Sequence, residues 1–267
     1  MTPGVYDDIP HDAYLAGPGV SVSALKTLAR EGGPARLRFG GHQESKALTF
    51  GSLIHTAVLE PDELPLRYHP VALTALNPNH KSYQAAEIQA AGREIVRRDD
   101  YEEALRIRDG VLHNAVARDM LGAGCRIEQS FYWTDDETGL LCRGRADGVR
   151  DDFRVLFDLK SCIDATWVGF AKSIEEYKYY WQDAWYRGGW ERAAGWAPDA
   201  FIFLAVEKER PYLTAAYEID PKDIEDGRDE TRRHLLRFAA CEASGQWPGL
   251  PDTLQLITRP ARRALQA

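Results

Sequence analysis

The hydrophobic pattern of the chain changes its period near residue 122, and this change restricts what the chain can fold into. Residues 1–20 are rich in Pro, Gly and Asp, and we interpret them as a loop. Between this segment and residue 122, apolar residues recur at helical spacing. The helices predicted there span residues 24–30, 47–59, 82–97 and 101–121. We therefore expect residues 1–121 to form a mainly helical portion.

Downstream of this point, the pattern is typical of a sheet with helices packed against it. Side chains alternate in polarity along the first predicted strand, and a short apolar run forms the third. The strands are predicted at residues 126–134, 140–149, 155–159, 200–206 and 212–219, and the helices at 165–192 and 221–244. This order predicts a mixed α/β fold. We expect a single domain over residues 1–267, with the sheet core at 122–245 and an irregular tail at 246–267.

Composition excludes several classes of protein. With 44% hydrophobic and 10% aromatic residues, the chain has enough surface to bury, which excludes a disordered protein. The formal net charge of −8 argues against a non-specific nucleic-acid binder, but DNA responds to the local field of a cleft, and acidic metal ligands add to the total. The four cysteines form no C-x-x-C pair, which argues against zinc ribbons and iron–sulfur clusters. The chain contains no Walker A motif, which argues against an ATPase.

The expected location is the cytoplasm. The N-terminal segment lacks the basic and apolar regions of a signal peptide, and no apolar run approaches the roughly 20 residues of a membrane span. Scattered cysteines are expected to stay reduced there. We therefore predict no association with a membrane.

Asp147, Asp158 and Lys160 carry the strongest chemical signal. The two aspartates lie near the ends of adjacent predicted strands, so a hairpin would bring both carboxylates to one end of the sheet. Two such carboxylates repel each other unless a cation or a proton lies between them, and a hard divalent ion such as Mg²⁺ prefers oxygen ligands. Lys160 shares a strand face with Asp158 and could reach a reacting phosphate. The pattern suits phosphodiester hydrolysis.

Each of these residues also has an ordinary structural interpretation. An Asp-x-Lys tripeptide alone is usually a solvated strand end, and a lone histidine on an apolar helix, here His55, is usually a core or surface residue. Glu128 is either a solvated side chain or a carboxylate of the site, and Arg145 either contacts DNA phosphate or pairs with a carboxylate. The aromatic residues at 177–186 are either core or a platform for unpaired bases.

Four segments together resemble the PD-(D/E)XK nuclease superfamily. Asp147 and Asp158-Leu159-Lys160 are similar to its core motif. Gly51–His55, Gly144–Asp147 and Gln182–Tyr186 resemble the G-x-x-x-H, glycine-to-aspartate and Q-x-x-x-Y motifs of its RecB-like branch. Such a resemblance implies a restriction-endonuclease-like core, in which a central mixed sheet is flanked by helices.

Within that branch, the chain is most similar to the C-terminal nuclease domain of the exonuclease VIII (RecE) group and its prophage relatives. That group shares segments like Ser21–Leu25, Ile127–Phe131 and Trp247–Gly249, and the similarity spans residues 5–250. It implies a magnesium-dependent exonuclease, with Mn²⁺ able to substitute, that degrades linear double-stranded DNA 5′→3′ and leaves 3′ overhangs for recombination. It also implies a homo-oligomeric ring and a single-strand annealing protein as partner.

The resemblance assigns a role to each site residue. His55, Asp147, Asp158 and the Leu159 carbonyl are expected to hold the metal, and Lys160 to activate the attacking water or stabilise charge. Gln182 and Tyr186 are expected to position Lys160 or the DNA backbone. Glu128, Arg145 and Lys178 are candidates for supporting the site or binding DNA. Two alternatives stay open, namely a structure-selective endonuclease and a non-catalytic DNA-binding module.

Overall fold

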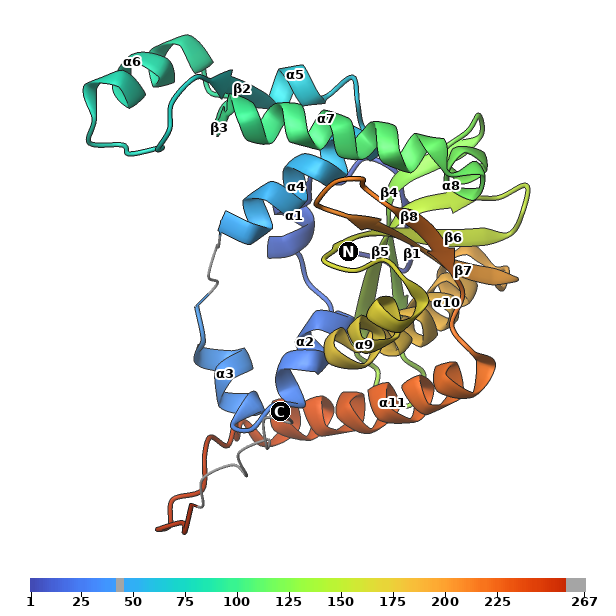
Figure 1. Ribbon diagram of the computed structural model, residues 1–267. Coiled ribbons are helices and arrows are strands. Elements are labelled where there is room, and N and C mark those ends of the chain that lie inside the picture. The colour runs from blue at the N-terminus through green and yellow to red at the C-terminus, as the bar shows by residue number, and fades with distance from the viewer. Residues whose placement is uncertain (42–45, 258–267) are drawn as a thin grey trace, which may run out of the picture.

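A six-stranded sheet forms the centre of the molecule, which the computed structural model describes over residues 1–41 and 46–257 (Figure 1). The strands lie in the order β1-β4-β5-β6-β7-β8. They span β1 (Gly4–Tyr6), β4 (Cys125–Thr134), β5 (Leu141–Arg150), β6 (Val155–Cys162), β7 (Ala200–Glu207) and β8 (Thr214–Tyr217). Neighbours are antiparallel except β6 and β7, which run parallel. The expected mixed α/β fold is confirmed.

Helices cover both faces of this sheet (Figure 1). They span α1 (His11–Ala16), α2 (Val22–Leu28), α3 (Gly33–Phe39), α4 (Lys46–Leu59), α5 (Leu64–Arg67), α6 (Lys81–Ala90), α7 (Arg98–His113), α8 (Ala115–Met120), α9 (Trp167–Tyr177), α10 (Tyr179–Ala194) and α11 (Pro221–Ser244). One apolar core joins α2, α9, α10 and α11 to the sheet, and another joins α4, α7 and α8 to its opposite face. Strand alternation supplies both cores, because Leu156 belongs to the first and Phe157 to the second.

A small parallel sheet stands apart from this core. It pairs β2 (Tyr68–Val71) with β3 (Glu94–Arg97), and α6 packs against it around a separate apolar cluster that includes Val71 and Ile95 (Figure 1). Among the residues that the structure describes, no helix is both long and apolar enough to cross a membrane.

Several predicted elements differ from the observed ones. Residues 1–20 are not simply loop, since they contain β1 and α1, and β1 pairs with β4. The helix predicted at 82–97 ends at Ala90, because Ala91 and Gly92 take positive φ angles of 51° and 88° and residues 94–97 pair with β2. Tertiary pairing overrides local propensity in both places.

Two long predicted helices are interrupted. Asn114 separates α7 from α8, and its side chain caps α8 by accepting a hydrogen bond from Ala117 N–H. Lys178 has φ 51° and separates α9 from α10 within the helix predicted at 165–192. The break allows α10 to change direction and to bury its aromatic side chains against the sheet.

Candidate metal centre and active site

A fork between β5 and β6 brings Asp147 and Asp158 together. The two strands are paired from Arg150 and Val155 up to Gly148 and Phe157, and the next residues in register are the two aspartates. The strands separate there, and the Leu159 N–H points into the gap, where it donates a 2.8 Å hydrogen bond to Asp147 Oδ2. One residue's N–H and C=O leave an extended strand toward the same edge, so the Leu159 carbonyl also points into the fork.

Two glycines of β5 pack against aromatic rings, Gly148 at the base of the fork and Gly144 beside β4. A Cβ on Gly148 would lie 2.0 Å from the Phe157 ring, and a Cβ on Gly144 would lie 2.2 Å from the Phe131 ring. Neither position therefore accommodates a side chain. The glycine before Asp147 in the sequence motif is explained by this packing of Phe131.

Glu128 extends the acidic row to a third strand. It lies between the pairs that Ile127 and Gln129 make with β5, and hence opposite Asp147. Its φ of 55° interrupts the alternation of side chains along β4. Side chains on either side of it therefore switch faces, and Ile127 packs in the second core while Phe131 lies in the first. The prediction that Ile127 and Phe131 share one face is therefore wrong. The turn directs Glu128 toward the fork instead of leaving it on a solvated face.

Arg145 holds Glu128 in place. Its side chain is only 12% exposed and forms an ion pair with the Glu128 carboxylate. The guanidinium also donates to the Ile9 carbonyl at 2.7 Å and to Ser130 Oγ at 3.4 Å. Of the two interpretations of Arg145, the structure shows the pairing with a carboxylate.

His55 reaches the acidic row from α4, on the side of the second core. Its Nδ1 lies 3.5 Å from Asp147 Oδ2, and one ligand atom each of His55, Glu128 and Asp147 lie within 4.8 Å of one another. The apolar face of α4, with Leu53 and Ile54 almost fully buried, anchors the helix against the sheet. His55 is thus not a core residue, since its side chain remains 31% exposed at the acidic row.

Asp158 is held by two other groups. Gln182 Nε2 on α10 donates a hydrogen bond to Asp158 Oδ1, and the Lys160 ammonium forms an ion pair with Oδ2. Apart from this ion pair, Oδ2 is buried and has no hydrogen-bond partner among the described residues. The Lys160 ammonium also lies 4.9 Å from the centre of the Tyr179 ring. Gln182 therefore contacts Asp158, whereas the sequence motif predicts that it positions Lys160 or the DNA backbone.

The electrostatics of the row favour a bound cation. Burial, followed by the charges of Asp158 and Glu128, raises the pKa of Asp147 well above its usual range. Burial lowers the pKa of His55, which favours the neutral imidazole that ligates metals. Although burial opposes its charge, the Asp158 carboxylate raises the pKa of Lys160 and keeps the ammonium protonated. Carboxylate oxygens, a neutral imidazole and a backbone carbonyl are a donor set that fits a divalent ion.

Two further predicted residues, Tyr186 and Lys178, lie near this site. Tyr186 is 8% exposed and packs edge-on against Phe131, with ring centres 5.4 Å apart, so it supports the site from beneath. Lys178 lies 3.7 Å from the Glu230 carboxylate and 3.2 Å from the Tyr180 hydroxyl. The Glu230 carboxylate therefore already offsets part of the positive charge of Lys178.

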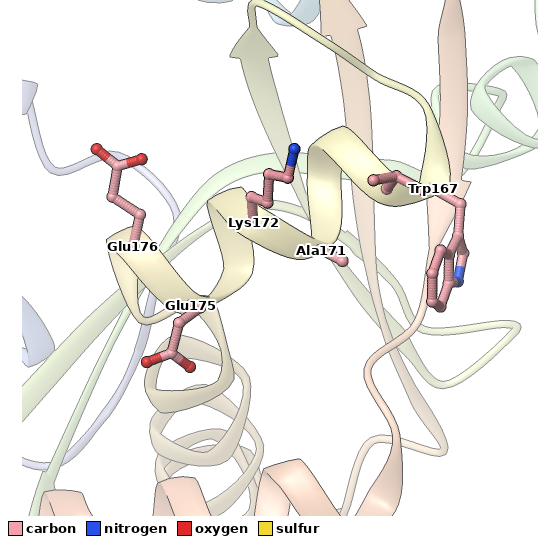
Figure 2. A pocket seen from close by; sticks show the side chains of 6 residues that line it. Trp167, Ala171, Lys172, Glu175 and Glu176 are labelled. Atoms are coloured by element: carbon pink, nitrogen blue, oxygen red, sulfur yellow. The ribbon is translucent and has the colours of Figure 1, made fainter. Parts of the chain in front are cut away.

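The aromatic residues of α10 belong to the core. Tyr180, Trp181, Trp185 and Tyr186 are all buried, which excludes them as a platform for unpaired bases. Exposed apolar surface lies instead on α9, where Trp167 is 73% exposed. An open groove there is lined by Trp167, Val168, Ala171, Lys172, Glu175 and Glu176 (Figure 2). None of these residues belongs to the acidic row, and two of them are acidic.

The sequence patterns missed Lys26 and Tyr179, which lie next to Lys160. Lys26 follows directly on the Ser21–Leu25 segment, so that motif could have drawn attention to it. In the sequence, Tyr179 is one of many aromatic residues at 177–186 and carries no signal of its own. Its position against Lys160 depends on the break between α9 and α10 at Lys178, and no local sequence pattern predicts this break.

Comparison with known proteins identifies the fold and the family. The profile described as "PDDEXK-like domain of unknown function (DUF3799)" matches residues 21–260. The crystal structure of a "Putative exonuclease" from Eubacterium rectale superposes with a TM-score of 0.65 at 13% identity, covering 95% of this chain and 96% of that one. The structure of SSO0001 gives a TM-score of 0.33 at 14% identity over 70% of this chain and 86% of that one, and it carries no argument. No curated protein matches the sequence significantly.

The family match covers the fork between β5 and β6 and all of the acidic row. The six-stranded mixed sheet flanked by helices agrees with a restriction-endonuclease-like fold, as the resemblance implied. Domains of this fold generally use divalent metals, and the match supports a nuclease. The chain belongs to the PDDEXK-like family, within the PD-(D/E)XK nuclease superfamily.

Proposed function

We propose that this protein is a magnesium-dependent exodeoxyribonuclease that hydrolyses linear double-stranded DNA. One observation carries the proposal: Glu128, Asp147 and Asp158 stand in one row across β4, β5 and β6, with the Lys160 ammonium beside them. Concentrated negative charge with an adjacent cation suits the hydrolysis of a phosphodiester. A protein that only bound DNA would gain nothing from burying these carboxylates.

The acidic row and its neighbours would supply the metal ligands. Asp147, Asp158, His55 and the Leu159 carbonyl would hold Mg²⁺, and Glu128 lies close enough to His55 and Asp147 to join them. When bound, the ion would lower the pKa of an attacking water and offset charge on the phosphate. Mn²⁺ accepts the same oxygen and imidazole ligands and would substitute for it.

Lys160, Gln182 and Arg145 would prepare the site for the reaction. Lys160 would place its positive charge where negative charge develops on the phosphate, and it is already protonated beside Asp158. Gln182 would keep Asp158 in a single orientation, because its amide holds one carboxylate oxygen. Arg145 would do the same for Glu128. The groups would thus be oriented before DNA arrives.

The finer parts of the proposal depend on similarity. The likeness of the motifs to the exonuclease VIII group supports 5′→3′ degradation, 3′ overhangs for annealing, a homo-oligomeric ring and a single-strand annealing protein as partner. The exonuclease description of the Eubacterium rectale protein supports attack at DNA ends. The same likeness to the exonuclease VIII group makes linear duplex DNA the proposed substrate.

Digestion of labelled DNA tests this proposal directly. The purified protein with Mg²⁺ is incubated with a linear duplex that carries distinct labels on its 5′ and 3′ ends, and separately with covalently closed circular DNA. We expect early release of the 5′ label as short products, while the circle stays intact. Nicking of the circle would establish an endonuclease instead, and the survival of both substrates would establish a binding module. Early release of the 3′ label would reverse the proposed polarity.

A further inference from the structure

A second lysine stands beside Lys160 and has no role in the site described so far. The Lys26 ammonium on α2 lies 5.7 Å from the centre of the Tyr179 ring, and the Lys160 ammonium lies 4.9 Å from the same centre. Two cations therefore meet at one aromatic ring next to the acidic row. The ring attracts both through its quadrupole, but it cannot neutralise either of them.

Lys26 has no anionic partner of its own. Within the part of the chain that the structure describes, it makes no hydrogen bond and no ion pair. The charge of Asp158 acts on Lys26, but this carboxylate already holds Lys160 and Gln182. Burial, and after it the charge of Lys160, lowers the pKa of Lys26 to about 7. Among the described residues, this ammonium group therefore has no carboxylate of its own and shares the charge of Asp158 with Lys160 and Gln182.

The fold holds Lys26 in this unfavourable position. Leu25 and Leu28 on the same helix are fully buried, Leu25 in the first core. Ser21 caps the helix by accepting a hydrogen bond from Ala24 N–H at 3.2 Å. The helix therefore cannot rotate its lysine into water without exposing apolar side chains. A partly buried ammonium group that extends from an anchored helix and has no counter-ion of its own is suited to bind an anion.

Phosphate is the anion that this position would meet. Lysine binds phosphate as a compact point charge with three donors and needs no planar, bidentate geometry. An anion that bound close to Lys26 and Lys160 would offset their mutual repulsion and favour the charged form of Lys26. In this place, beside the acidic row, a DNA strand would present its backbone.

We propose that Lys26 is a positioning residue that binds a backbone phosphate of the strand being cut, within one nucleotide of the scissile bond. This inference rests on the proposed nuclease function. Lys160 would then serve the reacting phosphate, while Lys26 would fix the register of the strand along the acidic row. Removal of Lys26 should weaken DNA binding and should also misplace the bond to be cut.

DNA binding without cleavage tests the inference first. The dissociation constant of a labelled duplex with a short overhang is measured in Ca²⁺ by fluorescence anisotropy over a series of salt concentrations. We compare the wild type with Lys26→Gln, with Lys26→Arg and with Lys222→Gln, which removes an exposed lysine from the first turn of α11. Lys26→Gln should bind about tenfold more weakly and lose about 0.7–0.9 of the logarithmic salt slope. Lys26→Arg should recover most of the affinity, and Lys222→Gln should match the wild type.

A single neutral linkage then locates the contact. One methylphosphonate is moved along the cut strand, and its effect on binding is compared between the wild type and Lys26→Gln. At one position near the cleavage site, the neutral linkage should weaken the wild type but leave Lys26→Gln unaffected. Losses that add at every position, or a Lys26→Gln variant with unchanged affinity and salt slope, would overturn the inference.

The two proposals fail in different ways. A wild-type protein that neither binds nor cuts DNA would refute the nuclease function itself. A wild type that cuts DNA while Lys26→Gln binds normally would refute only the role of Lys26. Because the ammonium lacks a partner, Lys26→Gln should unfold thermally at no lower temperature than the wild type. If that variant does not fold, Lys26→Met keeps the apolar stem and repeats both measurements.

Discussion

Replacing Lys160 by alanine is expected to lower the rate of phosphodiester cleavage about 10²–10³-fold, the usual cost of removing one group that stabilises developing charge. The affinity for DNA should change much less, because many backbone contacts share the binding energy. Single-turnover cleavage of an end-labelled duplex in Mg²⁺ measures the first effect, and anisotropy in Ca²⁺ measures the second.

A matched variant separates the role of Lys160 from a loss of positive charge in general. Lys222→Ala removes an exposed lysine from α11 and should retain the wild-type rate. Lys160→Arg keeps the charge but replaces a compact ammonium with a planar group, so we expect only partial recovery. Full activity of Lys160→Ala would remove this residue from the mechanism.

Replacing Asp147 by asparagine is expected to stabilise the metal-free protein while it abolishes activity. In the folded state, burial together with Asp158 and Glu128 raises the pKa of Asp147, so the ionised carboxylate opposes folding. An asparagine oxygen can still accept the Leu159 N–H, which Asp147 binds at 2.8 Å. Without divalent ions at neutral pH, we expect the free energy of unfolding to rise by on the order of 1 kcal/mol or more.

The size of this effect depends on pH. At a pH below the ordinary pKa of aspartate, the carboxyl is protonated in both states and the two proteins should be about equally stable. As pH rises toward the elevated pKa of the folded state, the wild type should lose stability relative to Asp147→Asn, because its folded state binds the extra proton. Chemical denaturation in chelator at several pH values measures the difference.

Divalent ions should reverse the order of stability. At a concentration of about 100 times its dissociation constant, a bound ion would add about 2.7 kcal/mol to the wild type, and Asp147→Asn should gain far less. The control, Glu176→Gln, removes an exposed carboxylate from α9 and should respond to the ion as the wild type does. Equal stabilisation of wild type and Asp147→Asn by Mg²⁺ or Mn²⁺ would show that Asp147 holds no ion.

Sequence patterns predicted the central hairpin because its signals are local. Alternating residues and a turn defined β4 and β5, and a short apolar run defined β6, so Asp147 and Asp158 could be placed on adjacent strands. They were expected at one end of the sheet, but they lie inside β5 and β6, where the two strands separate. The α4 helix with His55 and the α10 helix with Gln182 were also predicted, since their apolar faces recur at helical spacing. These strands and helices carry all the expected metal ligands and Lys160.

The rest of the site depends on tertiary structure that no local pattern reports. Glu128 joins the row through a positive φ that a non-glycine residue rarely adopts. Continuous alternation could not decide between a solvated side chain and a carboxylate of the site. Lys26 comes from a helix more than a hundred residues away from Lys160 in the sequence and meets it only through Tyr179. Strand β1 has only three residues and shows no strong hydrophobic pattern, since it is stabilised by its pairing with β4.

The metal dependence of DNA cleavage tests the central claim most directly. The protein is treated with chelator, and cleavage of a linear duplex is followed while Mg²⁺ is returned, in parallel with Asp158→Asn. We predict no cleavage in chelator, full recovery of the wild type in Mg²⁺ and no recovery of the variant. Cleavage by the purified protein in chelator, or an Asp158→Asn variant that recovers fully, would contradict a metal-dependent nuclease site at the fork between β5 and β6.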